Sequence, residues 1–195
     1  MTALRQFVRP RAAEERCDLC GAGIPAEHRH LADPKARQIV CACKACSLLF
    51  SGQQSARFRV VPEDVRALPE LSLTDGQWQR LAIPIELAFF YRSTPEGRVV
   101  AFYPSPAGAT ESLLPLEAWN EIAAANPVLE TMEPDVEALL VNRIAKPPRF
   151  FIAPIDACYE LVGLIRMKWR GFSGGAEVWS AIGDFFDRLK ERARA

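Results

Sequence analysis

The chain has 195 residues, of which 49% are hydrophobic and 25% are charged, a composition typical of globular proteins. Its 24 basic residues balance its 24 acidic residues, so the formal net charge at pH 7 is zero. This balance argues against nucleic acid as the partner, because strong non-specific binding to nucleic acid requires an excess of basic residues.

The sequence predicts a cytoplasmic protein without a membrane span. Residues 1–16 carry several arginines where a signal peptide requires an apolar core. No run approaches the roughly 18 apolar residues that mark a transmembrane helix. Because cytoplasmic thiols stay reduced, the six cysteines indicate metal or redox chemistry rather than disulfide bonds.

The distribution of cysteines divides the chain into two parts. Five of them lie between residues 17 and 46, and the sixth is Cys158, which apolar neighbours favour as a core residue. We therefore predict a Cys-rich metal-binding module over residues 1–56 and an α+β body over residues 57–195.

The predicted elements of the module form a turn, a hairpin and a second turn. Cys17 to Cys20 is expected to turn tightly, and residues 28–33 and 38–42 are expected to pair as short strands. Residues 43–46 supply the second turn. This order is typical of a zinc ribbon or a treble clef.

The body is predicted to combine a small, mostly antiparallel sheet with helices gathered towards the C-terminus. The predicted strands are residues 57–61, 83–91, 98–103 and, more ambiguously, 136–144. The predicted helices are a short one capped by Thr74 or Asp75 and ending at Leu81, then residues 116–125, 154–169 and 176–192. The fold class is therefore α+β.

Two C-x-x-C turns predict a metal site. Zinc prefers four ligands in a tetrahedron, and thiolates bind it at about 2.3 Å. Each C-x-x-C turn brings two sulfur atoms to one ion, and the 22 residues between the turns leave room for the hairpin. The predicted ligands are Cys17, Cys20, Cys43 and Cys46.

The residues alone leave alternative ligands and an alternative cofactor open. Cys41 lies two residues before Cys43, so in an extended strand it shares a face with Cys43 and could replace it or lie beside the site. His28 and His30 share a strand face in the same way, and either could supply one ligand or lie outside the ligand set. An iron–sulfur cluster is the alternative to zinc, since cysteines ligate both.

No motif identifies a catalytic residue, so the sequence favours a non-enzymatic role. An iron–sulfur or thiol redox protein is the alternative, although the βαβ setting of a thioredoxin-type site is absent. A His-Asn-His-type nuclease also combines C-x-x-C turns with histidines, but the residues after Cys46 offer no further catalytic group. Aromatic residues over 89–103 could stack nucleic-acid bases, but core packing is the expectation.

Two stretches carry a resemblance to a known family. Cys17–Leu31 with Cys41–Cys46, and Pro154–Arg166 with Trp169–Gly175, resemble an uncharacterised bacterial family often encoded beside uptake nickel–iron hydrogenase genes. The resemblance implies an accessory or assembly protein whose partner is a hydrogenase subunit or maturation factor. It also marks Trp169–Gly175 as a candidate partner surface.

Overall fold

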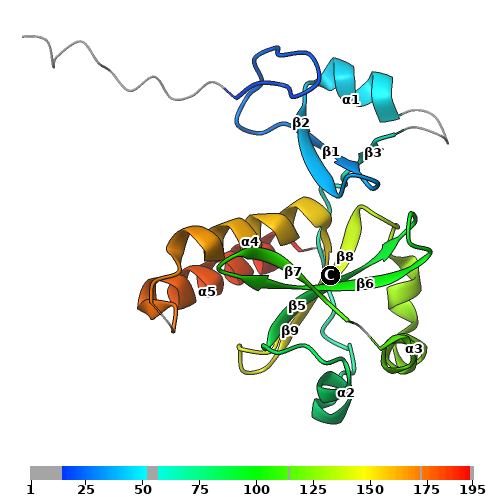
Figure 1. The fold of residues 1–195 in the computed structure, drawn as a ribbon, viewed down its shortest axis with the longest axis vertical. Coiled ribbons are helices and arrows are strands. Elements are labelled where there is room, and N and C mark those ends of the chain that lie inside the picture. Colours follow the sequence, from blue (N-terminus) through cyan, green and yellow to red (C-terminus); the bar gives the residue numbers. More distant parts are fainter. Residues whose placement is uncertain (1–14, 52–56, 114, 172, 194–195) are drawn as a thin grey trace, which may run out of the picture. The chain divides into compact units, whose positions relative to one another are not determined.

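The chain forms two compact units in the computed structural model, Met1–Val60 and Val61–Ala195. Figure 1 shows their elements. The structure describes residues 15–51, 57–113, 115–171 and 173–193. The division falls four residues after the predicted boundary at 56/57. The reason is a short strand at Arg59–Val60, which pairs within the first unit.

The described residues of the first unit form a three-stranded antiparallel sheet and one helix. Its elements are β1 (Arg29–Asp33), β2 (Gln38–Ala42), α1 (Lys44–Ser51) and β3 (Arg59–Val60). Strand β1 lies between β2 and β3. The predicted hairpin is thus confirmed, whereas the strand predicted over residues 57–61 joins this unit and not the body.

Helix α1 corrects the prediction of a second turn over residues 43–46. The carbonyl of Cys43 accepts a hydrogen bond from the backbone N–H of Ser47 at 2.9 Å, which is the first bond of a helix. The Cys43 sulfur accepts another from the N–H of Cys46 at 3.4 Å, as an N-cap side chain does. Residues 43–46 therefore form the first turn of a helix, the arrangement expected of a treble clef.

The second unit is built on a six-stranded sheet in which every neighbouring pair is antiparallel. Its strands are β4 (Arg66–Ala67), β5 (Leu87–Ser93), β6 (Arg98–Ser105), β7 (Gly108–Ser112), β8 (Glu137–Asn142) and β9 (Arg149–Pro154), in the order β4-β9-β8-β5-β6-β7. Its helices are α2 (Asp75–Arg80), α3 (Leu116–Ala125), the 3-10 helix η2 (Pro127–Thr131), α4 (Ile155–Lys168) and α5 (Gly175–Arg192). The predicted α+β class is confirmed.

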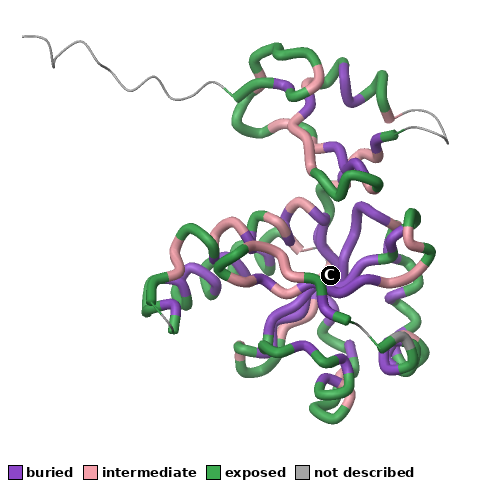
Figure 2. The backbone as a smooth tube through the Cα atoms, in the orientation of Figure 1, coloured by how far each residue is buried: buried purple, intermediate pink, exposed green. Residues whose placement is uncertain are grey.

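Helices cover both faces of this sheet, so its central strands are buried (Figure 2). On one face Phe90 packs against Trp78 of α2 and Trp119 of α3. On the other face Phe89 packs against Tyr159 of α4. Successive residues of one strand thus serve two cores, because side chains alternate across a sheet.

The predicted aromatic strands are core elements. Phe89, Phe90, Tyr91 and Phe102 are each at most 5% exposed, so these rings are not available to stack nucleic-acid bases. The structure thereby supports the core-packing interpretation of this hairpin.

Several elements of the body begin and end close to their predicted positions. Thr74 caps α2 with a complete capping box, in which its hydroxyl accepts from the N–H of Gln77. The predicted helix 116–125 is α3, and the predicted strand 136–144 contains β8. Strands β4, β7 and β9 were not predicted. Strand β9, buried over its last four residues, lacks the alternation that marks a half-buried strand.

The turn before α5 requires glycine at residue 174, and replacing it is expected to destabilise the second unit. Gly174 has φ +84°, and an added Cβ would lie 2.8 Å from Val178 Cγ1 and 3.1 Å from the Trp169 ring. Gly174→Ala should therefore cost at least about 1–2 kcal/mol, the penalty of a left-handed conformation alone. Urea unfolding followed by tryptophan fluorescence measures this.

Gly163→Ala is the matched control, since Gly163 lies inside α4 with nothing within 4 Å of an added Cβ. This change should stabilise the unit by up to about 1 kcal/mol. Equal stability of the two variants would contradict the role given to Gly174.

Candidate metal centre

Cys17 and Cys20 lie on a tight turn that the backbone fixes. The N–H of Gly21 donates to the carbonyl of Cys17, and the N–H of Cys17 donates to the carbonyl of Ala22, both at 2.8 Å. Gly21 has φ +75°, a conformation that glycine adopts without strain. These bonds place the two sulfur atoms on one side of the turn.

Asp18 joins this turn to the hairpin. Its backbone N–H donates to the carbonyl of Cys41 at 2.9 Å, and its carboxylate accepts from the N–H of Cys41 at 2.6 Å. The turn is therefore held against the end of β2, immediately before Cys43. Sequence reasoning did not identify Asp18. The signal that could have found it is the presence of an acidic residue inside a C-x-x-C turn.

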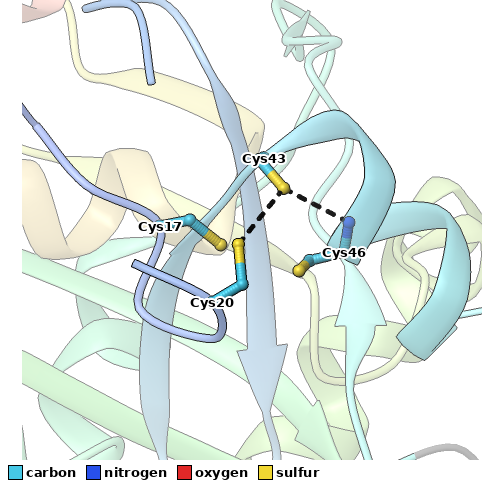
Figure 3. A group of neighbouring side chains, drawn as sticks. All are labelled: Cys17, Cys20, Cys43 and Cys46. Atoms are coloured by element: carbon cyan, nitrogen blue, oxygen red, sulfur yellow. Dashed lines mark hydrogen bonds between the residues drawn. The ribbon is translucent and has the colours of Figure 1, made fainter. Parts of the chain in front are cut away.

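Cys43 and Cys46 come from the first turn of α1, so all four predicted ligands converge. Figure 3 shows their side chains pointing toward one another. The four sulfur atoms lie within 4.8 Å of one another, and Cys20 Sγ lies 3.8 Å from Cys43 Sγ. Four thiolates at the usual zinc–sulfur distance would be separated by about 3.8 Å along each tetrahedral edge. The arrangement therefore fits one tetrahedral ion.

The electrostatics of the four thiols also suit a cation. Burial raises the pKa of the Cys17 thiol, but hydrogen bonds from backbone groups of Cys43, Leu19 and Cys20 outweigh it and lower this pKa to about 6. Burial, hydrogen bonds with the other three sulfur atoms and the negative charge of Cys17 raise the pKa of Cys46 to about 12. Four neighbouring thiolates repel one another, and a bound metal ion removes that penalty. The N-terminus of α1 adds positive potential.

The three alternative ligands do not join the four-cysteine group. His28, His30 and Cys41 form a second group of their own, whose potential ligand atoms also lie within 4.8 Å of one another. All three are half-buried. Burial and the charges of Asp18, Glu15 and Cys17 raise the pKa of Cys41.

Cys158 is a core residue, as we predicted from the apolar residues around it in the sequence. It lies in α4, is fully buried, and burial together with the charge of Asp156 raises its pKa. A thiol in this environment is poorly reactive, which fits packing and not catalysis.

The segment Trp169–Gly175 forms a hydrogen-bonded turn between α4 and α5, apart from residue 172, which lies outside the described residues. The Trp169 indole donates to the carbonyl of Gly171 at 2.8 Å, and the Trp179 indole donates to that of Ser173 at 3.0 Å. The two indole rings meet edge to face, with centroids 6.1 Å apart. Trp179 is 44% exposed, so an aromatic surface accompanies the turn.

The comparison with known protein families covers both units. The family of unknown function DUF5947 matches residues 16–193. The chain belongs to this family. No curated protein and no solved structure matches it. The DUF5947 match spans all four cysteines and both C-terminal helices, so the metal centre and the body occur within one family pattern.

The DUF5947 chain brings together four cysteines that are able to hold a metal ion. Among the described helices, none is long and apolar enough to cross a membrane. What the site can do chemically is bind a metal ion through four sulfur atoms.

Proposed function

We propose that this protein is a zinc-binding accessory or assembly protein in which the metal is structural. The observation that carries this proposal is the compact four-sulfur group, in which the protein itself supplies every tetrahedral position. Structural zinc sites are closed in this way, whereas catalytic zinc sites keep one position for water or substrate. The first unit has few buried apolar side chains apart from these cysteines, so an ion would contribute much of its stability.

The spacing of the sulfur atoms supports a single ion over an iron–sulfur cluster. In a cluster the four cysteines are divided between two or more iron atoms, which spreads their sulfur atoms farther apart than one ion does. All four sulfur atoms lie within 4.8 Å of one another, which suits four thiolates on the same ion. A redox protein or electron carrier remains the alternative function, and iron content and colour distinguish it from the proposed one.

The proposed accessory function also requires a surface that binds a protein partner. Leu48, Leu49 and Phe50 of α1 are 69%, 75% and 47% exposed, although apolar residues of a short helix usually pack inward. We call these three residues the α1 apolar surface. Exposed apolar residues that cluster in this way are typical of protein-binding sites. The turn Trp169–Gly175 is the second candidate surface.

The identity of the partner rests on the family resemblance alone. The resemblance favours a subunit or maturation factor of a nickel–iron hydrogenase in the cytoplasm. A reducing cytoplasm would keep the four thiols available for metal.

Metal content tests the proposed site. We expect protein purified anaerobically to retain one zinc ion per chain through gel filtration, and Cys20→Ser to lose it, because three thiolates hold zinc less tightly than four. Elemental analysis measures both. The matched control is Cys41→Ser, which removes a thiol outside the four-cysteine group and should leave this zinc in place.

Three results would contradict the assignment. Stoichiometric iron and sulfide would show that the site holds an iron–sulfur cluster and not zinc. Retention of zinc by Cys20→Ser would remove that residue from the ligand set, and loss of zinc from a folded Cys41→Ser protein would add Cys41 to it.

A further inference from the structure

A second cluster of metal-ligating side chains lies on the β1–β2 hairpin. His30 in β1 is directly opposite Cys41 in β2, and cross-strand partners place their side chains on the same face. His28 lies immediately before β1, two residues before His30. The potential ligand atoms of the three residues lie within 4.8 Å of one another.

The contacts of His28 Nδ1 leave its Nε2 atom as the potential metal ligand. Its Nδ1 lies 2.9 Å from the carbonyl oxygen of Pro25 and 3.2 Å from a carboxylate oxygen of Glu15. Both oxygens only accept hydrogen bonds, so Nδ1 carries the hydrogen, and in the neutral ring Nε2 then carries a lone pair. Metal-bound histidines commonly donate their second nitrogen to a carboxylate or a carbonyl in this way.

The Nε2 atom of His28 is buried without a hydrogen-bond partner. The side chain is 7% exposed, and among the described residues nothing bonds to this atom. A buried polar atom left without a partner loses the hydrogen bond that water would give it, which is unfavourable. A metal ion bound at Nε2 would satisfy the lone pair.

The other two proposed ligands, His30 and Cys41, are also positioned by contacts within the first unit. The backbone N–H of Cys41 donates to the Asp18 carboxylate at 2.6 Å. The rings of His28 and His30 meet edge to face, with centroids 4.8 Å apart. The carboxylates of Glu15 and Asp18 add negative charge near Cys41, which favours a cation there.

We propose that His28, His30 and Cys41 form a second metal site, distinct from the four-cysteine site, that binds a divalent transition-metal ion, zinc being the expected one. Two imidazoles and a thiolate are ligands that zinc accepts, and three protein ligands leave the fourth position open for water or another small ligand. The Cys41 thiol gives up its proton to solvent as it binds the ion. The two sites share no residue.

The second site differs from the first in how it holds its ion. With three protein ligands the second site keeps one coordination position open, through which the ion can exchange, whereas four thiolates close the first site. We therefore expect the first zinc to survive purification and the second to bind on addition of metal. This inference goes beyond the structural role proposed for the four-cysteine site.

Titration of the full-length protein, loaded with one zinc ion, tests the inference. Zn²⁺ and Co²⁺ are added separately under anaerobic reducing conditions, with calorimetry for stoichiometry. The chain contains two histidines, both in the proposed site, so imidazole NMR signals report on this site alone. We expect one further equivalent to bind and to shift both imidazoles, and Co²⁺ to give tetrahedral absorption bands with a thiolate charge-transfer band.

Three variants identify the ligands and the carboxylate that supports His28. His28→Gln and Cys41→Ser should each weaken the second equivalent at least about 100-fold, because two ligands remain. Glu15→Gln should weaken it about 10-fold through His28, the lower end of the effect of such supporting groups. Retention of the first zinc shows that each variant is folded, and His30→Gln replaces any variant that loses it.

The wild-type protein alone can overturn the proposal, and the variants provide a second test. Failure to bind a second equivalent, or binding that leaves both imidazole signals unchanged, would overturn the proposal. Unaltered second binding in a folded His28→Gln or Cys41→Ser protein would also overturn it. These results leave the proposed function intact, because that depends on the first zinc and on Cys20.

Discussion

Removal of metal from the full-length protein is expected to unfold the Met1–Val60 unit and to leave the Val61–Ala195 unit folded. The first unit has a small buried cluster that includes two of the four proposed metal ligands, Cys17 and Cys46. Structural zinc contributes roughly 10–16 kcal/mol of apparent binding free energy in small zinc-binding units, and there it equals folding free energy. Hydrogen exchange resolves the two units separately.

Chelation should therefore abolish exchange protection across residues 29–51 while the strands of the six-stranded sheet keep theirs. All four tryptophans lie in the second unit, so tryptophan fluorescence should not change. Returning zinc is the control and should restore protection. Unchanged exchange in the first unit after verified metal removal would show that its fold does not depend on the ion.

The same chelated sample tests where a partner binds. If the α1 apolar surface is the binding surface, pull-down of a candidate hydrogenase protein should fail with the metal-free protein. Leu49→Asp should abolish it with zinc still bound, because this side chain is 75% exposed and contributes little to folding. Binding that persists both in the metal-free protein and in Leu49→Asp would show that the α1 apolar surface is not the binding surface. Trp169–Gly175 would then be the next candidate.

Phe90→Ala is expected to destabilise the second unit by about 3–5 kcal/mol, the usual cost of removing a buried aromatic side chain. Phe90 is 1% exposed and its ring centroid lies 6.3 Å from that of Trp78 and 5.2 Å from that of Trp119. The loss therefore leaves a cavity between the sheet and two helices. Urea unfolding followed by tryptophan fluorescence measures the change in the free energy of unfolding.

Leu113→Ala is the matched control, because Leu113 is 96% exposed and should change the stability by less than about 0.5 kcal/mol. Both variants should keep the zinc of the first unit, since Phe90 and Leu113 belong to the second. Loss of zinc from Phe90→Ala would show that the units do not fold independently.

The sequence by itself determined the features that depend on neighbouring residues. The C-x-x-C pairs defined the four cysteines that the structure brings together, because each turn is closed by bonds within a few residues. The capping candidates Thr74 and Asp75 predicted α2, and the helix predicted over residues 176–192 corresponds to α5, for the same reason. Local chemistry is sufficient for such elements.

Only the tertiary structure decided the features that depend on distant residues. Pairing with β1 placed β3 in the first unit, and the hairpin register placed Cys41 opposite His30, in a group other than that of the four cysteines. In the body, the contacts of Phe89 and Phe90 with helices on opposite faces follow from strand pairing across the sheet. Spacing along a chain shows which side chains share a strand face, but strand pairing decides which strands, and therefore which ligands, meet.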